Sequence, residues 1–120
     1  MKRILIIEDN ESNIYLISFI LKKHGYDVIE ARSGEEGIAL AFNARPDLII
    51  MDIQLSGLDG LETTRRIRQS EGDEKIPSIA LTSFAMMGDR ERALAAGCTG
   101  YIEKPINPET FINEIESYLL

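Results

Sequence analysis

Short apolar runs separated by longer amphipathic segments are the feature that most constrains how this chain folds. The runs occupy residues 4–7, 28–29, 48–51, 79–81 and 101–102. Two of them, ILII and LIIM, are apolar on every consecutive residue, which is typical of strands covered on both faces. Between the runs, apolar residues recur at helical spacing, as in the stripe of Ile14, Ile17 and Leu21. The alternation predicts an α/β fold, with a parallel sheet and helices on both of its faces.

The segments between the runs also carry signals for where helices begin and end. N-terminal capping signals are Ser33 with Glu36, Asp59 with Glu62, and Asn107 followed by Pro108. Gly25 and Gly97 have the position of C-terminal stops, because glycine readily adopts the left-handed conformation that ends many helices. These signals predict helices that fit between the apolar runs.

Length and composition narrow the class of protein. A chain of 120 residues is long enough to bury a core as one domain, and we expect residues 1–120 to form it. The only cysteine, Cys98, has no partner within the chain for a disulfide, and no apolar run approaches the ~20 residues of a membrane helix. We therefore expect a soluble, cytoplasmic protein with no secretory leader and no membrane contact. Its net charge of −7 argues against direct binding of nucleic acid.

Polar residues follow four of the apolar runs, at the points where the expected strands end. They are Glu8 and Asp9 after the first run, Asp52 after the third, Thr82 after the fourth, and Glu103, Lys104 and Pro105 after the fifth. For any one of them, a residue that reaches solvent or caps the next helix is as good an explanation as a residue of a site. Ligands of open parallel sheets, however, bind beyond the carboxyl ends of the strands, so the set together indicates a site.

The residue types at these strand ends favour phosphoryl chemistry. Glu8, Asp9 and Asp52 should converge, and carboxylates ~4 Å apart repel by about 4 kcal/mol at an effective dielectric of 20. Mg²⁺ would offset this repulsion, since it prefers carboxylates, waters and phosphate oxygens. Lys104 and the Thr82 hydroxyl could bind phosphoryl oxygens, which leaves Asp52 as the expected nucleophile and an aspartyl phosphate as the product.

The segments IIEDN, LIIMDIQLSGLDG, ALTSFA and GYIEKPI resemble the receiver domain of bacterial two-component response regulators. The resemblance extends over essentially the whole chain, and each motif falls at the expected strand end. It implies a flavodoxin-like (βα)5 fold, in which a central five-stranded parallel sheet has the strand order 2-1-3-4-5. It also implies that the chain is a phosphoacceptor in signalling and not an enzyme, although such domains assist their own phosphorylation and dephosphorylation.

The resemblance also assigns roles to individual residues. The implied Mg²⁺ ligands are Glu8, Asp9, Asp52 and the backbone carbonyl of Gln54. Asp52 would be the phosphoacceptor, with Thr82 and Lys104 binding the phosphoryl oxygens. Tyr101 matches an aromatic residue that swings inward when the threonine moves, so phosphorylation would remodel the surface of the fourth helix, fifth strand and fifth helix. The peptide before Pro105 is a candidate for the cis conformation.

Partners follow from the same resemblance. The phosphoryl donor would be a histidine kinase or a histidine phosphotransfer protein, and a downstream effector protein would bind the switched surface. The sequence leaves open whether the chain forms a homodimer and whether it is a fragment of a longer protein. Two residues depart from the commoner family pattern: Glu8 stands where aspartate is usual, and Ser56 where proline is frequent.

Three alternatives share part of the pattern. An aspartate-nucleophile phosphohydrolase would normally have a second acid where this chain has Gln54. A flavodoxin would share the fold, but the acidic segment EDNESN would repel the flavin phosphate. A pseudo-receiver, which binds partners without being phosphorylated, is the third, and the presence of every expected pocket residue argues against it.

Overall fold

The computed structural model describes residues 2–55, 59–70, 76–82, 88–104 and 106–119. Its strands are β1 (Arg3–Ile7), β2 (Asp27–Ala31), β3 (Leu48–Asp52), β4 (Ser78–Thr82) and β5 (Gly100–Glu103). Its helices are α1 (Glu11–Lys23), α2 (Gly34–Ala44), α3 (Gly60–Ser70), α4 (Asp89–Ala96) and α5 (Pro108–Tyr118). The expectations for Ser56 and Pro105 lie outside the described residues.

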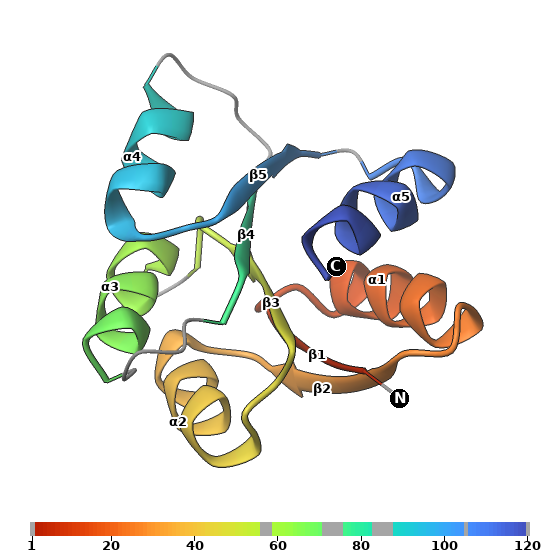
Figure 1. Ribbon diagram of the computed structural model, residues 1–120, viewed down its shortest axis with the longest axis horizontal. Helices are drawn as coiled ribbons and strands as arrows, with labels where there is room; N and C mark the ends of the chain where they lie inside the picture. The colour runs from red at the N-terminus through yellow and green to blue at the C-terminus, as the bar shows by residue number, and fades with distance from the viewer. Residues whose placement is uncertain (1, 56–58, 71–75, 83–87, 105, 120) are drawn as a thin grey trace.

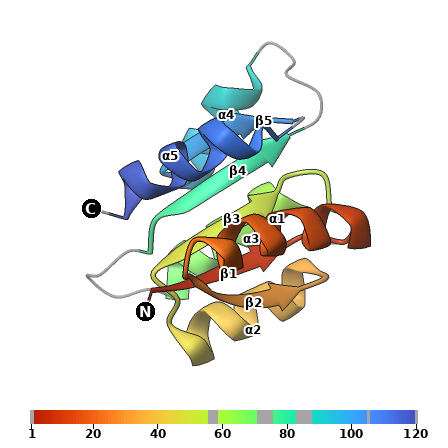
Figure 2. The same ribbon diagram turned by 90° about the vertical axis from the view of Figure 1, so that its right-hand side faces the viewer.

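The strands form one parallel sheet with the order β2-β1-β3-β4-β5, which confirms the predicted architecture. The strands run in the same direction in Figure 2. In the register of the central pair, Ile7 of β1 lies opposite Met51 of β3. The residues that follow, Glu8 and Asp52, therefore leave the sheet side by side at its carboxyl edge. The order of the strands reverses between β1 and β3, where ligands of such sheets bind.

Helices cover both faces of the sheet (Figure 1). Helices α1 and α5 lie on one face, and α2, α3 and α4 lie on the other. Alternate residues of β1 serve the two faces: Ile4 and Ile6 pack in the cluster with α1 and α5, while Leu5 and Ile7 pack in the cluster with α2 and α3. Full burial of each such side chain contributes about 1.5–3 kcal/mol. The unbroken apolar runs are explained by this two-sided burial.

The extent of burial differs between inner and edge strands. All residues of β3 and β4 are buried, as are the last four of β1. The edge strands β2 and β5 are only partly buried, because each has one neighbouring strand. Among the helices in the described ranges, none combines the length and apolar character needed to cross a membrane.

The predicted helix caps are present. The Ser33 side chain accepts a hydrogen bond from the Glu36 N–H, and Asp59 Oδ1 accepts one from the Glu62 N–H at 2.9 Å. Asn107 caps α5, with Pro108 as its first residue. Gly25 and Gly97 have φ angles of 88° and 114°, in the left-handed region that favours glycine at a helix end.

Gly60, at the start of α3, is pressed against the backbone of Asp52. A Cβ at residue 60 would lie 2.5 Å from the Asp52 carbonyl oxygen, and backbone cannot move as a flexible side chain could. We predict that Gly60→Ala lowers the free energy of unfolding by about 1–3 kcal/mol in urea denaturation, as overpacking does. Gln69→Ala, at an exposed position of the same helix, is the control. A Gly60→Ala variant as stable as this control would contradict the prediction.

Candidate functional site

Three carboxylates gather at the carboxyl edge of the sheet. Glu8 and Asp9 follow β1, Asp52 is the last residue of β3, and one carboxylate oxygen from each lies within 4.8 Å of the others. Glu8 and Asp52 are buried, whereas Asp9 is exposed. The structure thus brings together the acids that the sequence places at separate strand ends.

Lys104, which follows β5, lies beside this acidic cluster. Its ammonium Nζ lies 3.1 Å from Asp52 Oδ2 and 3.4 Å from Glu8 Oε2. The lysine backbone is fixed in turn, because its N–H donates to the Thr82 carbonyl at 2.7 Å and continues the pairing of β5 with β4. The Lys104 side chain is only 11% exposed, so solvent weakens these two ion pairs less than it would at the surface.

The Asp52 carboxylate is held at both oxygens. Oδ2 faces Lys104, and Oδ1 accepts a hydrogen bond from the backbone N–H of Gln54 at 2.9 Å. With 5% of its surface exposed, Asp52 is oriented by the protein more than by water. Gln54 therefore lies beside Asp52, the predicted phosphoacceptor, and its backbone carbonyl stays a predicted metal ligand.

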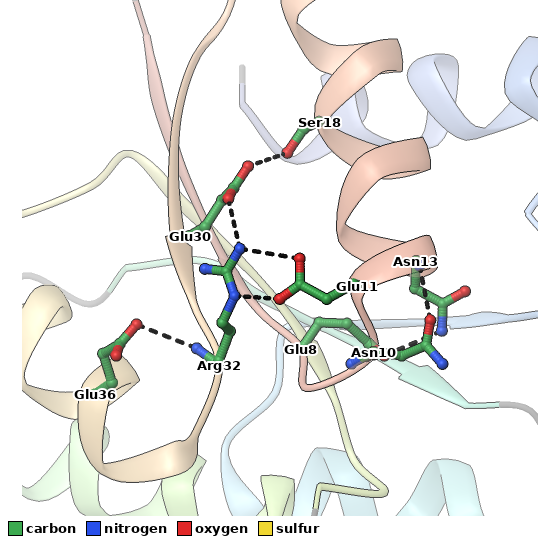
Figure 3. Close-up of polar contacts among 8 residues, drawn as sticks. All are labelled: Glu8, Asn10, Glu11, Asn13, Ser18, Glu30, Arg32 and Glu36. Atoms are coloured by element: carbon green, nitrogen blue, oxygen red, sulfur yellow. Dashed lines mark hydrogen bonds and ion pairs between the residues drawn. The ribbon is translucent and has the colours of Figure 1, made fainter.

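Glu8 is the most deeply buried of the three acids, at 1% exposure. Its Oε1 accepts hydrogen bonds from the Asn13 side-chain amide at 3.0 Å and from the Asn10 N–H at 3.3 Å. Both asparagines lie at the start of α1, beside Glu8 (Figure 3). Neither was singled out from the sequence. The spacing of Asn10 and Asn13 was a usable signal, since Asn10 caps the helix by accepting from the Asn13 N–H.

Burial raises the pKa of the Glu8 carboxyl above its ordinary value, and the neighbouring Asp52 raises this pKa further. Hydrogen bonding by Asn13 and the charge of Lys104 act in the opposite direction without cancelling the effect of burial. The ionised form of Glu8 is therefore destabilised in the folded protein.

The charges in the cluster do not balance. With all groups ionised, three carboxylates and the Lys104 ammonium leave a formal charge of −2. The donors are hard carboxylate oxygens within a few ångströms of one another, as a small divalent cation prefers. The site therefore fits a divalent metal ion in both charge and donor type.

Thr82 and Tyr101 lie on β4 and β5, the two strands at the Lys104 side of the sheet. Thr82 ends β4 and is fully buried. Tyr101 pairs with Ala80 in the sheet register and is half-buried against the small cluster that includes Ala93 of α4. Burial and the charge of Glu103 raise the pKa of the Tyr101 phenol, while an interaction with the Thr82 side chain lowers it. The predicted switch residues are thus neighbours in the structure.

An ion-pair network around Arg32 joins the start of α1 to β2 and α2 (Figure 3). The Arg32 guanidinium contacts the carboxylates of Glu11 and Glu30, and its backbone N–H donates to Glu36 at 3.2 Å. Glu30 also accepts a hydrogen bond from the buried Ser18 hydroxyl at 2.8 Å. Hydrogen bonding by Arg32 lowers the pKa of the exposed Glu11 carboxyl, and the charge of Arg32 lowers it further. Exposed pairs of this kind contribute little to stability.

Comparison with known proteins decides the family. The family model of the response regulator receiver domain matches residues 4–116. The chain belongs to this family.

Individual relatives cover nearly the whole receiver domain. The polar-differentiation response regulator DivK of Brucella ovis is 48% identical over 118 residues, which are 98% of this chain and 96% of the relative. Chemotaxis protein CheY4 of Vibrio cholerae matches the structure with a TM-score of 0.93 at 31% identity, over 99% of both chains. The receiver domain of sensor histidine kinase PA1611 from Pseudomonas aeruginosa, solved with a magnesium ion coordinated in its active site cleft, has a TM-score of 0.90 at 36% identity, over 98% of this chain and 97% of that one.

These comparisons confirm the predicted family, fold and role. The chain is a CheY-like receiver domain similar to DivK, which supports a role in phosphorelay signalling and disfavours the phosphohydrolase and flavodoxin alternatives. The pseudo-receiver alternative is not favoured either, because the acidic cluster and Lys104 are present and close together.

The raised pKa of Glu8 makes a prediction about stability. A carboxyl whose pKa is higher in the folded than in the unfolded state weakens folding as pH rises through the unfolded value, and the loss is complete above the folded value. We therefore predict that Glu8→Gln stabilises the metal-free receiver domain at pH 7, and that this advantage disappears below about pH 4, where the carboxyl is protonated in both states.

Chemical denaturation in EDTA across this pH range measures the effect. The control is Glu114→Gln, at an exposed position on α5, whose stability should follow that of the unmodified chain. A Glu8→Gln variant that is less stable at pH 7 would show that Lys104 and Asn13 outweigh the cost of burying this charge.

Proposed function

We propose that Asp52 accepts a phosphoryl group from a histidine kinase or a histidine phosphotransfer protein. One observation carries the proposal: the Asp52 carboxylate lies at the carboxyl end of the central strand, 3.1 Å from Lys104 Nζ and within 4.8 Å of oxygens from two further acids. Buried acids beside a cation and other acids are typical of sites that handle phosphate and metal ions.

In the proposed step a carboxylate oxygen of Asp52 attacks the phosphorus of the donor's phosphohistidine. The new O–P bond forms as the P–N bond breaks, and the donor imidazole leaves as a neutral group once it has acquired a proton. The Lys104 ammonium lies close enough to Asp52 to stabilise negative charge as it moves from the carboxylate to the phosphoryl oxygens. Thr82 supplies a hydroxyl at the end of β4. Gln54 holds the acceptor in one orientation through its N–H.

The acidic cluster is proposed to hold Mg²⁺. Glu8, Asp9 and Asp52 would bind it through carboxylate oxygens, with the Gln54 carbonyl as a further ligand. When bound, the ion supplies positive charge that stabilises the transferring phosphoryl group. The formal charge of −2 in the cluster and its hard oxygen donors support this assignment.

The proposed output is a change in the surface formed by α4, β5 and α5. Phosphorylation would draw Thr82 toward the phosphoryl group, and Tyr101 would respond because the two side chains are neighbours. A downstream protein that binds only one arrangement of this surface would then detect the modification. The domain thus acts as a cytoplasmic switch that assists its own phosphorylation and dephosphorylation.

Small phosphodonors test the proposal without knowledge of the kinase. On incubation with acetyl phosphate and Mg²⁺, intact mass spectrometry should show one added phosphoryl group, and EDTA should abolish it. Asp52→Asn should give no adduct, because the amide is a poor nucleophile. Asp47→Asn changes an exposed aspartate at the opposite end of β3 and should be modified as fully as the unmodified chain.

Beryllofluoride with Mg²⁺ separates the remaining outcomes. A chain that gains no phosphoryl group but binds this mimic accepts phosphate only from its own donor. A chain that binds neither is a pseudo-receiver, and that result would contradict the proposed function.

A further inference from the structure

The two oxygens of the Glu8 carboxylate have different kinds of partner. Oε1 accepts from neutral donors, the Asn13 amide at 3.0 Å and the Asn10 N–H at 3.3 Å. Oε2 faces the Lys104 ammonium at 3.4 Å. Asn13 therefore holds one side of the carboxylate while Lys104 attracts the other.

The backbone that carries the Asn13 side chain is held by the helix cap and by the core. Its backbone N–H donates to Asn10 Oδ1 at 3.0 Å within the cap of α1, and the next residue, Ile14, is buried at 2% exposure. The first residue of the helix, Glu11, is paired with Arg32 at the end of β2 (Figure 3). The cap and the buried Ile14 thus fix the start of the helix from which the amide is presented, as a positioning group requires.

The chemical type of the group that donates to Glu8 matters as much as the position of that group. An amide donates a hydrogen bond without adding charge, so the cluster keeps its formal charge of −2. A lysine at residue 13 would reduce that charge to −1 and compete with a bound cation. Glutamate also has one more rotatable bond than aspartate, so its carboxylate needs a partner that fixes its direction.

We propose that Asn13 is a positioning residue for Glu8, and that it keeps the longer glutamate arm from moving closer to Lys104 than the 3.4 Å seen in the structure, in an orientation that binds Mg²⁺. The inference rests on the proposed function, in which Glu8 is a ligand of the ion. Without the Asn13 amide, the carboxylate is free to turn toward the Lys104 ammonium, and that tighter ion pair would oppose the binding of the metal ion. Asn13 therefore acts on metal affinity through Glu8.

Magnesium affinity measured without phosphodonor tests this directly. Amide chemical shifts of the ¹⁵N-labelled chain are followed by NMR as Mg²⁺ alone is added. Asn13→Ala should weaken binding by about 3- to 10-fold, the range expected for one hydrogen bond. Asn113→Ala makes the same change on α5, where the side chain donates to the Glu109 carbonyl of its own helix, and Ser12→Ala makes a change beside Asn13. Both controls should bind within about two-fold of the unmodified chain.

A double-mutant cycle with Glu8→Asp distinguishes positioning from a general structural role. Aspartate shortens the arm by one C–C bond, roughly 1.5 Å, which takes the carboxylate out of reach of the Asn13 amide. Asn13→Ala should therefore change the affinity of the Glu8→Asp chain by less than about two-fold. An equal loss in both backgrounds, or no loss in either, would overturn the inference.

A second variant tests the role of charge. Asn13→Lys keeps a hydrogen-bond donor at this position but adds a cation, so it should weaken Mg²⁺ binding more than Asn13→Ala does. Binding of Mg²⁺ by Asn13→Lys as tightly as by the unmodified chain would overturn the inference. If the unmodified chain showed no Mg²⁺-dependent shifts, the proposed function would fail together with the inference. If it bound Mg²⁺ and Asn13→Ala bound equally well, only the role of Asn13 would fail.

Discussion

Mutual repulsion among three carboxylates is the constraint on which the rest of this structure depends. Carboxylate oxygens of Glu8, Asp9 and Asp52 lie within 4.8 Å of one another. At that separation each ionised pair repels by roughly 3–4 kcal/mol at an effective dielectric of 20. Lys104 offsets part of this energy, and the charge that remains fits a divalent cation. In the proposed function, the same charges that cost stability bind the metal ion.

The sheet holds the acids together in spite of this cost. Ile7 is opposite Met51, and Met51 is opposite Ala80, so the inner strands end at nearly the same level. Slipping β1 by one residue would move its apolar side chains from one cluster to the other and disrupt the close packing of both, which makes the register strongly specified. The buried core thus fixes the distance between Glu8 and Asp52, and Lys104 is carried to them by the pairing of β5 with β4.

Much of this arrangement was predictable from the sequence because it depends on local patterns. Consecutive apolar residues predicted the inner strands, and capping residues such as Ser33 and Asn107 predicted where helices begin. The contact between Asn13 and Glu8 was not predicted, since it depends on how α1 turns back over the end of β1. The Arg32 network was missed for a similar reason: long side chains from α1, β2 and α2 meet only in the folded chain. Fold pattern alone also could not separate a receiver from a flavodoxin, and the acids at the strand ends made that distinction.

Linkage between Mg²⁺ and folding tests the central claim most directly. The free energy of unfolding is measured by urea denaturation over a series of Mg²⁺ concentrations, for the unmodified chain and for Asp52→Asn. If the acidic cluster binds the ion, the stability of the unmodified chain rises steadily with the logarithm of Mg²⁺ concentration once the site begins to fill. Asp52→Asn, with one charge removed, should be the more stable protein without Mg²⁺ and should gain much less from it. Equal gains for both proteins would contradict the account, because the ion would then be acting elsewhere on the chain.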